Sequence, residues 1–171
     1  MRDPTYNGWA SILNTKGQVD AIMLDFSKAF DKVSHTKLIH KLQYCGISGK
    51  ILLWLSAFLI NWSQFVSVEC SHSSYTKVFS GVPQGTVLGP ILFLIYINVI
   101  ANSCDSTIRL LADDTVIYRN ISSSSYHDLL QHDLDNLETW AAILQMSFNA
   151  TKCKLLSITN KKKQSEFAYS F

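Results

Sequence analysis

The spacing of apolar and polar positions along the chain predicts a fold that mixes strands with helices. Short apolar or alternating runs, the usual pattern of strands, occur at Val19–Leu24, Phe65–Val68, Tyr75–Phe79, Ile108–Ala112, Thr115–Tyr118 and Lys154–Thr159. The Phe65–Val68 and Tyr75–Phe79 runs flank a polar segment, which predicts that they pair with each other. A second hairpin is expected to turn at Asp113–Asp114, because Asp tolerates the backbone angles of tight turns.

Apolar residues at helical spacing fill most of the remaining chain. Helices are predicted at Ser34–Cys45, Ser48–Ile60, Ile91–Ile100 and Tyr126–Met146. The first has one apolar face and stops at Gly46, a favourable residue after a helix end. The second is apolar nearly all round, so we expect it to be buried. Together the elements indicate an α/β or α+β class, in which helices cover one sheet.

Length and composition are those of one globular domain. The chain has 171 residues, of which 47% are hydrophobic and 16% charged, and its formal net charge is +2. This balance does not favour a dedicated nucleic-acid-binding arm, since positive charge concentrates only at Lys161–Lys163. The cysteines lack Cys-x-x-Cys spacing, which argues against a zinc site and against a disulfide framework.

Neither membrane insertion nor secretion is indicated by the sequence. The most apolar stretches, Ile51–Ile60 and Val87–Ile97, are only about half as long as a bilayer requires. The residues at the N-terminus lack the apolar segment of a secretory signal. We therefore expect an intracellular protein without a membrane partner, and the sequence leaves nuclear and cytoplasmic locations open.

Asp25 is the first candidate for chemistry, because it stands at the end of a predicted buried strand. A carboxylate there is costly to remove from water unless a positive charge neutralises it, and a hard divalent cation does so well. The alternative is that Asp25 only caps a helix that begins near Ser27. Taken by itself, the residue favours the capping interpretation.

Asp113 and Asp114 form the second candidate, because a tight turn would hold their carboxylates together. By themselves they are better explained as a solvated acidic turn. A strand-end Asp beside such a pair in one sheet, however, would make a site of three carboxylates for two Mg²⁺ ions. Two such ions activate the attacking oxygen and stabilise the leaving oxygen in phosphoryl transfer.

The third candidate is the Gly-rich segment Ser80–Pro90. Glycine lets the backbone approach another molecule closely, and the Gln84 side chain can bond to a base or to the sugar-phosphate backbone. The alternative is an ordinary rigid connection between a strand and a helix.

Taken together, these segments resemble the palm of a reverse transcriptase, specifically that of a non-LTR (LINE-type) retrotransposon. The matching segments, in the order of the family's motifs, are Leu24–Val33, Ser80–Asn98, Leu111–Thr115 and Phe148–Lys154. The family usually has Phe or Tyr where this chain has Leu111. The resemblance implies a polymerase palm with a small, mainly antiparallel sheet covered by helices.

The resemblance also implies roles for individual residues. Asp25, Asp113 and Asp114 would bind Mg²⁺, with Mn²⁺ as a possible substitute, helped by the backbone carbonyl of Phe26. Phe30 would reject a ribose 2′-hydroxyl, and Gln84 and Gly85 would line the template and nucleotide site. Lys152 would assist the pyrophosphate leaving group, with Lys154 as the competing choice. The reaction would add deoxynucleotides to a DNA primer on an RNA template.

The resemblance divides the chain into a residual fingers segment or linker (1–18), a palm (19–160) and a basic, polar tail (161–171). Fingers and thumb would be largely missing. We therefore expect a truncated retroelement fragment, with fingers, thumb and endonuclease segments supplied by a longer parent protein. The alternatives are a non-catalytic remnant, reused for binding RNA or protein, and a two-metal nuclease, which would leave the Pro83–Gly85 loop and Phe30 unexplained.

Overall fold

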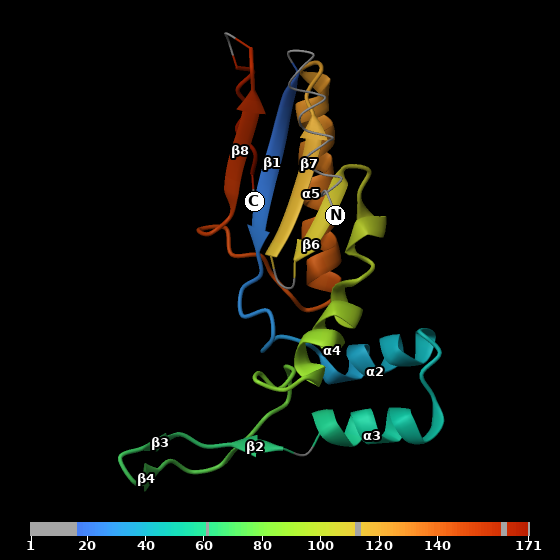
Figure 1. Ribbon diagram of the computed structural model, residues 1–171, viewed down its shortest axis with the longest axis vertical. Coiled ribbons are helices and arrows are strands. Elements are labelled where there is room, and N and C mark those ends of the chain that lie inside the picture. The colour runs from blue at the N-terminus through green and yellow to red at the C-terminus, as the bar shows by residue number, and fades with distance from the viewer. Residues whose placement is uncertain (1–16, 61, 112–113, 162–163, 171) are drawn as a thin grey trace. The chain divides into compact units, whose positions relative to one another are not determined.

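The computed structural model describes residues 17–60, 62–111, 114–161 and 164–170. The chain forms two compact units (Figure 1). The described part of unit 1 comprises residues 17–27, 99–111, 114–143, 147–161 and 164–170, and that of unit 2 comprises 28–60, 62–98 and 144–146. No helix among the described residues combines the length and the apolar character needed to cross a membrane.

Unit 1 is built on a four-stranded antiparallel sheet in the order β6-β7-β1-β8. Its strands are β1 (Gln18–Asp25), β6 (Thr107–Leu111), β7 (Asp114–Asn120) and β8 (Lys154–Thr159). The central strand β1 is buried almost throughout, as its apolar run predicts. The predicted mixture of a small antiparallel sheet with helices is confirmed, and all strands of this sheet begin or end within a few residues of their expected positions.

Helix α5 (Ser125–Ile143) covers one face of this sheet (Figure 1). Its buried residues include Leu130, Leu134 and Leu137, which lie at helical spacing. The helix ends before the predicted Met146. Gln145 has a φ of 59°, a left-handed conformation that cannot continue a right-handed helix.

Residues 164–170 run back along β1 and α5. The Ser165 N–H donates to Gln18 Oε1 at 2.9 Å, and Gln18 Nε2 donates to the Ser165 carbonyl at 2.8 Å. The Tyr169 hydroxyl donates to Asp20 Oδ2 at 2.8 Å, and the ring of Phe167 stacks on that of His127. Burial, followed by the hydrogen bond to Asp20, raises the pKa of Tyr169 above its ordinary value. These residues are therefore an integral part of unit 1.

Unit 2 contains the helices α2 (His35–Tyr44), α3 (Gly49–Leu59) and α4 (Leu88–Ile97). Their existence and approximate positions are as predicted, and Pro90 lies in the first turn of α4, where its missing N–H costs nothing. The expectation that the second helix is buried all round is wrong. In α3 only Leu55 and Leu59 are buried, while Leu53 is 71% exposed.

The predicted pairing of Phe65–Val68 with Tyr75–Phe79 is replaced by two shorter pairs. Strand β2 (Ser63–Gln64) pairs with β5 (Thr76–Lys77), and β3 (Ser67–Val68) pairs with β4 (Ser71–His72). The left-handed backbone of Glu69 and Cys70, with φ values of 45° and 67°, turns the chain between β3 and β4. The segment is thus a hairpin whose turn lies earlier than the sequence pattern indicates.

Candidate active site

The end of β1 brings two of the candidate carboxylates together. Asp25 lies directly opposite Asp114 of β7 in the antiparallel ladder. Directly opposed residues project to the same face of a sheet. The burial pattern identifies this face: Leu24 and Thr115 are buried toward α5, whereas Met23 and Asp114 are exposed on the other side. Both carboxylates therefore stand on the sheet face that α5 leaves open.

The third candidate, Asp113, lies outside the described residues. Strand β6 pairs Leu111 with Asp114, so Asp114 is the first residue of β7 and not part of the turn as predicted. Asp114 is therefore a strand residue. This places Asp114 in a register fixed by backbone hydrogen bonds and directly across from Asp25.

Neighbouring contacts fix the end of β1. The Asn149 N–H donates to the Asp25 carbonyl at 2.7 Å, and Phe26 bridges to Phe148, on whose ring it stacks at a centroid distance of 4.6 Å. Residues 27–32 form turns. Because no helix begins near Ser27, the interpretation of Asp25 as a helix cap is wrong.

One oxygen of the Asp25 carboxylate receives no hydrogen bond from the described residues and could bind a cation. Its Oδ2 atom is buried and accepts no hydrogen bond within the described parts of the chain, although the Lys152 ammonium lies 3.3 Å away. That distance makes an ion pair, but the geometry is not that of a hydrogen bond. Lys152 is 64% exposed, so water screens its charge and the pair contributes little to stability. An oxygen in this state, facing a second carboxylate, suits a hard divalent ion.

A cavity of about 410 Å³ opens beside these side chains. Asp25, Asp114, Lys152 and Lys154 line it, together with Thr151, which the sequence analysis did not single out. Two carboxylates are among the groups that line this cavity. Among the described residues, no group of three His, Cys, Asp or Glu side chains is suited to hold a metal ion. The third carboxylate that the sequence analysis predicts is that of Asp113, which lies outside the described residues.

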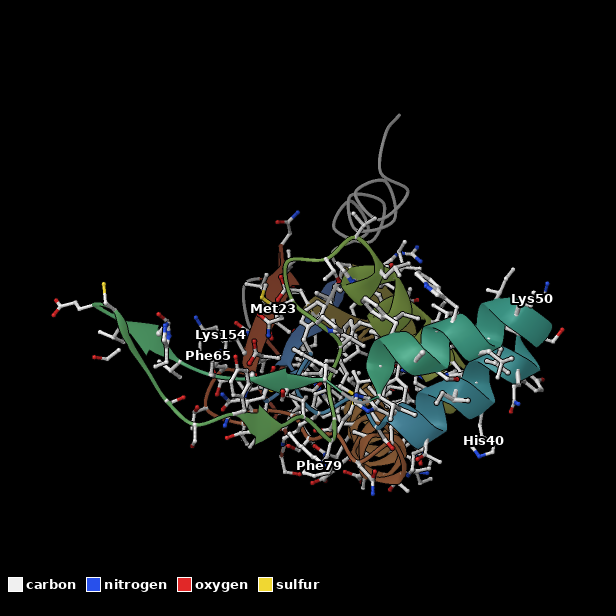
Figure 2. All side chains as sticks on the ribbon, turned by 90° about the horizontal axis from the view of Figure 1, so that it is seen from below. Met23, His40, Lys50, Phe65, Phe79 and Lys154 are labelled. Carbon is white, nitrogen blue, oxygen red and sulfur yellow. The ribbon has the colours of Figure 1, made fainter. Side chains whose placement is uncertain are left out.

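The two candidate lysines differ in their relation to Asp25. Lys152 belongs to a turn after Asn149 and pairs with Asp25, whereas Lys154 is the first residue of β8 and lies opposite Met23 (Figure 2). Both face the same cavity. Among the described candidate metal ligands, Asp25 is contacted by Lys152 and not by Lys154, which favours Lys152 for a role near the carboxylates.

The candidate nucleotide-site residues Phe30, Gln84 and Gly85 lie in unit 2. Phe30 stacks on Phe93 of α4 at 4.7 Å, and its carbonyl accepts the Val82 N–H at 2.8 Å. The φ of Gly85 is 77°, which favours glycine. The Gly-rich segment is thus hydrogen-bonded to the part of the first motif that lies in unit 2.

Asp31 is the residue in this region that the sequence analysis missed. Its Oδ1 atom accepts Gln84 Nε2 at 3.2 Å, and its carbonyl accepts the Ser80 hydroxyl at 2.8 Å. Gly81 passes so close that a Cβ there would lie 2.9 Å from the Phe30 carbonyl oxygen. The signal in the sequence was a charged residue next to apolar Phe30 in the first motif.

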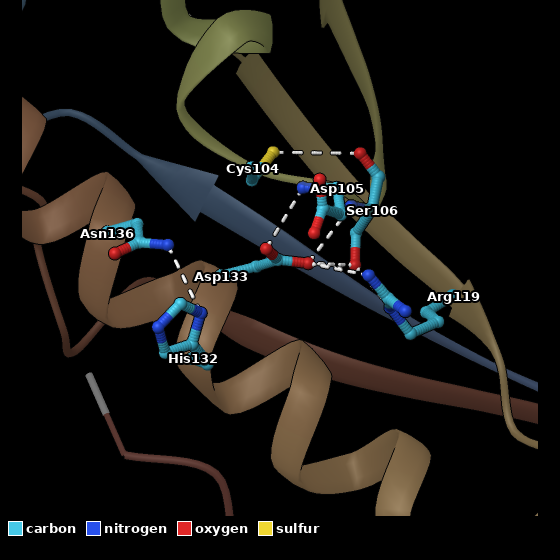
Figure 3. A network of polar contacts seen from close by, with 7 residues as sticks. All are labelled: Cys104, Asp105, Ser106, Arg119, His132, Asp133 and Asn136. Carbon is cyan, nitrogen blue, oxygen red and sulfur yellow. Dashed lines mark hydrogen bonds and ion pairs between the residues drawn. The ribbon is translucent and has the colours of Figure 1, made fainter.

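A second polar cluster in unit 1 is structural (Figure 3). The buried carboxylate of Asp133 accepts the backbone N–H groups of Asp105 and Ser106, the Ser106 hydroxyl, and Arg119 Nη2 at 3.0 Å. Burial alone would raise the pKa of Asp133, but these hydrogen bonds, that from the Ser106 hydroxyl foremost, outweigh it and lower the pKa. Burial, and then the nearby carboxylates, raise the pKa of Cys104 to about 11, so its thiol is not reactive at neutral pH.

Comparisons with known proteins identify the family of the chain. A family model described as reverse transcriptase (RNA-dependent DNA polymerase) matches residues 6–169. The RNA-directed DNA polymerase from mobile element jockey of Drosophila funebris is 31% identical over 157 residues, which are 86% of this chain and 17% of that protein. The probable RNA-directed DNA polymerase from transposon X-element of Drosophila melanogaster is 26% identical over 156 residues, again 17% of its length. The chain thus spans a small part of these curated relatives.

Solved structures show the same fold at low sequence identity. Apo telomerase from Candida tropicalis, truncated from its C-terminal domain, matches with a TM-score of 0.68 at 14% identity, over 95% of this chain and 37% of that one. Telomerase from Candida albicans, in complex with a fragment of telomeric RNA, matches with a TM-score of 0.65 at 14% identity, over 96% of this chain and 32% of that one.

Proposed function

The chain belongs to the reverse transcriptase (RNA-dependent DNA polymerase) family, and from this premise we propose that it carries the palm of an RNA-directed DNA polymerase of the non-LTR retrotransposon type. The proposed reaction is attack of a DNA primer 3′-hydroxyl on the α-phosphate of a deoxynucleotide, with RNA as template. The observation that carries the proposal is the opposition of Asp25 and Asp114 across β1 and β7, on the open face of the sheet.

In the proposed site, Asp25 and Asp114 hold divalent metal. Their opposed carboxylates and the unsatisfied Oδ2 atom of Asp25 support this role, and Asp113 and the Phe26 carbonyl would complete the ligand set. Two bound Mg²⁺ ions, or Mn²⁺ in their place, would lower the pKa of the primer hydroxyl and stabilise the negative charge on the leaving pyrophosphate.

Other side chains serve substrate binding and the leaving group. Lys152 sits within ion-pair distance of Asp25, and we assign it the neutralisation or protonation of pyrophosphate. In unit 2, Phe30 is held against Phe93 and would exclude a ribose 2′-hydroxyl by its bulk. Gln84 and Gly85 would contact the template and the incoming nucleotide.

Primer extension by the full 171-residue chain tests the reaction. The assay contains an RNA template, a DNA primer, deoxynucleotides and Mg²⁺. We expect extension by the wild type, none by Asp25→Asn or Asp114→Asn, and unchanged extension by Asp128→Asn. Asp128 is a matched control because it is exposed in the first turn of α5 and undergoes the same substitution.

Metal binding provides a readout that does not require turnover. Electron paramagnetic resonance of Mn²⁺ should show binding that Asp25→Asn and Asp114→Asn each weaken by about tenfold or more, a loss of roughly 1.4 kcal/mol per ligand. Equal Mn²⁺ binding by these variants and the wild type, together with no extension, would contradict the proposal. It would instead favour a non-catalytic module that binds RNA or protein.

A further inference from the structure

Four side chains of unit 1 form a surface on which residues 164–170 lie. These side chains, called the docking surface, are Gln18 and Asp20 of β1 and His127 and Gln131 of α5. We propose that the docking surface is a binding site for an extended peptide with the pattern Ser-x-Phe-x-Tyr. Residues 164–170 fill this site as an intramolecular ligand, which a peptide with the same pattern can replace.

Two glutamine side chains of the docking surface hold the backbone of the segment. The Gln18 carboxamide accepts the Ser165 N–H at 2.9 Å and donates to the Ser165 carbonyl at 2.8 Å. The Gln131 carboxamide makes the same two contacts with Ser170, at 2.9 and 3.2 Å. A carboxamide both donates and accepts, so each glutamine bonds one residue of the segment as a neighbouring strand would. These contacts require a peptide backbone and no particular side chain.

Three side chains of the segment face the docking surface. Ser165, Phe167 and Tyr169 are half-buried and the residues that alternate with them are exposed, which is the period of an extended chain. The Phe167 ring stacks on that of His127, with centroids 5.1 Å apart and an interplanar angle of 3°. The Tyr169 hydroxyl donates to Asp20 Oδ2 at 2.8 Å, and Ser165 Oγ lies 2.9 Å from His127 Nε2. These three contacts define the pattern that the surface recognises.

The polar side chains of the docking surface also bond to neighbours outside the segment. Gln18 Nε2 donates to Asp20 Oδ1 at 2.9 Å, and Gln131 Nε2 donates to Asp135 Oδ1 at 2.8 Å. His127 Nδ1 lies 3.3 Å from Asp20 Oδ2, and both side chains are almost completely buried. Because Asp20 keeps two partners of its own, the segment can leave without stranding an unpaired buried carboxylate.

The segment is held by its contacts and is not built into the sheet. The structure describes residues 164–170 in full, and none of them is completely buried or belongs to a strand. Strand β1 already pairs with β7 on one side and with β8 on the other. The segment therefore completes unit 1 in the way that a bound peptide would, through two backbone anchors and three side chains.

The docking surface is separate from the candidate active site. Alternate residues of a strand face opposite sides of a sheet. Gln18 and Asp20 share the side of Leu24, which is buried toward α5, whereas Asp25 stands on the open side. Peptide binding thus goes beyond the proposed function and uses none of the side chains assigned to it.

A peptide added in trans tests whether the site accepts a ligand. The probe is a labelled peptide with the sequence of residues 164–170, and its binding to the full 171-residue chain is measured by fluorescence anisotropy. In the wild type, the attached segment competes at an effective concentration in about the millimolar range, so the peptide should bind weakly. The double variant Phe167→Ala/Tyr169→Ala removes the aromatic anchors of the attached segment and leaves the docking surface unchanged. It should bind the peptide about tenfold more tightly or better.

Gln164→Ala is the matched control for this experiment, because Gln164 is an exposed residue of the same segment. The control chain should bind the peptide as weakly as the wild type does. Equal binding by the double variant and the wild type would overturn the proposal.

Changes in the peptide and in α5 test the recognised pattern. A Tyr169→Phe peptide keeps the ring and loses the donor to Asp20, so it should bind the double variant about threefold to tenfold more weakly. An Ala168→Ser peptide, changed at an exposed position, should bind unaltered. In the double-variant chain, Gln131→Ala should cost about threefold in affinity, and His132→Ala, at its exposed neighbour, should cost nothing. Full affinity of the Tyr169→Phe peptide, or equal losses at Gln131 and His132, would contradict the proposal.

Two further arms keep the test decisive. Circular dichroism checks folding, and if the double variant does not fold, Tyr169→Phe in the chain replaces it, with an expected gain in peptide affinity of about threefold. No gain in that variant either would reject the site. Asp25→Asn should abolish primer extension and leave peptide binding unchanged, so failure of one proposal is distinguishable from failure of the other. Loss of peptide binding in Asp25→Asn would place the peptide on the open face of the sheet and overturn the inference.

Discussion

Asp25 lies directly opposite Asp114 in the ladder between β1 and β7, so two carboxylates share one position of the sheet. Like charges placed directly opposite each other destabilise a sheet, typically by a few tenths of a kcal/mol to about 1 kcal/mol. Under the proposed function, a bound divalent cation would offset this repulsion.

This opposition predicts a trade-off between stability and activity. In metal-free buffer, Asp114→Asn should raise the free energy of unfolding by about 0.5 kcal/mol at low salt, with a smaller gain at high salt because ions screen the repulsion. The same variant should not extend a primer. Urea denaturation at two salt concentrations measures the effect, and a destabilised variant would show that the carboxylates do not repel.

Substitution of Lys152, which pairs with Asp25, should change metal affinity and turnover in opposite directions. Removing the ammonium that lies 3.3 Å from Asp25 takes away a competing positive charge, so Lys152→Met should strengthen Mn²⁺ binding about two- to threefold, the equivalent of roughly 0.5 kcal/mol for an exposed pair. Its extension rate should nevertheless fall. Lys154→Met is the control, because Lys154 lies opposite Met23 and not opposite a carboxylate. A larger loss of turnover in Lys154→Met would assign the leaving-group role to that lysine.

Phe30 predicts the sugar specificity of the reaction. If its ring excludes the 2′-hydroxyl, Phe30→Ala should incorporate ribonucleotides that the wild type rejects, at some cost in stability from the lost stacking on Phe93. Extension reactions supplied with ribonucleotides alone measure this. Continued rejection of ribonucleotides by an active Phe30→Ala enzyme would remove Phe30 from this role.

Substitution of Gly81 tests how closely the Gly-rich segment packs against the first motif. Its φ is +94° and a Cβ would lie 2.9 Å from the Phe30 carbonyl oxygen, so Gly81→Ala should cost about 2 kcal/mol or more of unfolding free energy. Gly46 has a similar φ of +86° but no neighbour within 4 Å of an added Cβ. Gly46→Ala should therefore cost only about 1 kcal/mol, from backbone strain alone. Equal losses in urea denaturation would show that the close approach relaxes freely.

The pKa of Asp133 predicts how the stability of unit 1 changes at acidic pH. Its pKa in the folded protein lies below the ordinary value of 3.8, so its stabilising contribution is present above that pH and is lost as the pH falls through the folded pKa. Asp133→Asn should lose about 3 kcal/mol at neutral pH, because Arg119 is left without its carboxylate (Figure 3). Thermal unfolding between neutral pH and pH 2 should show a smaller acid loss for the variant than for the wild type.

Local patterns were sufficient to predict the strands of unit 1 and the position of Asp25 at a strand end. They misplaced Asp114 because the hairpin register depends on backbone pairing between β6 and β7, which places Leu111 across from Asp114. Local patterns also predicted, wrongly, that α3 is buried. The pattern shows which residues are apolar, but it does not show how many other elements pack around the helix. Leu53 is apolar and 71% exposed.

Buried polar residues were the other class that the sequence analysis missed. Asp20 sits inside an apolar strand run, and Asp133 lies on the apolar face of α5, where each has partners far away in the chain. Their contacts with Tyr169 and Ser106 arise only after folding brings these segments together. A charged residue within an otherwise apolar periodic face is the signal that could have identified them.

The strand order β6-β7-β1-β8 places the earliest of these strands in the chain, β1, between two strands that come much later. Strand β1 leaves the ribosome first, yet its partners are distant along the chain: Val19 pairs with Asn120 on one side and Gln18 with Thr159 on the other. Almost all of unit 2 emerges in between and can make contacts such as that of Phe30 with Val82 while β1 is unpaired. Such long-range pairing slows folding and leaves a strand edge open to aggregation. The strand that carries Asp25 is thus the one that must wait longest for its neighbours.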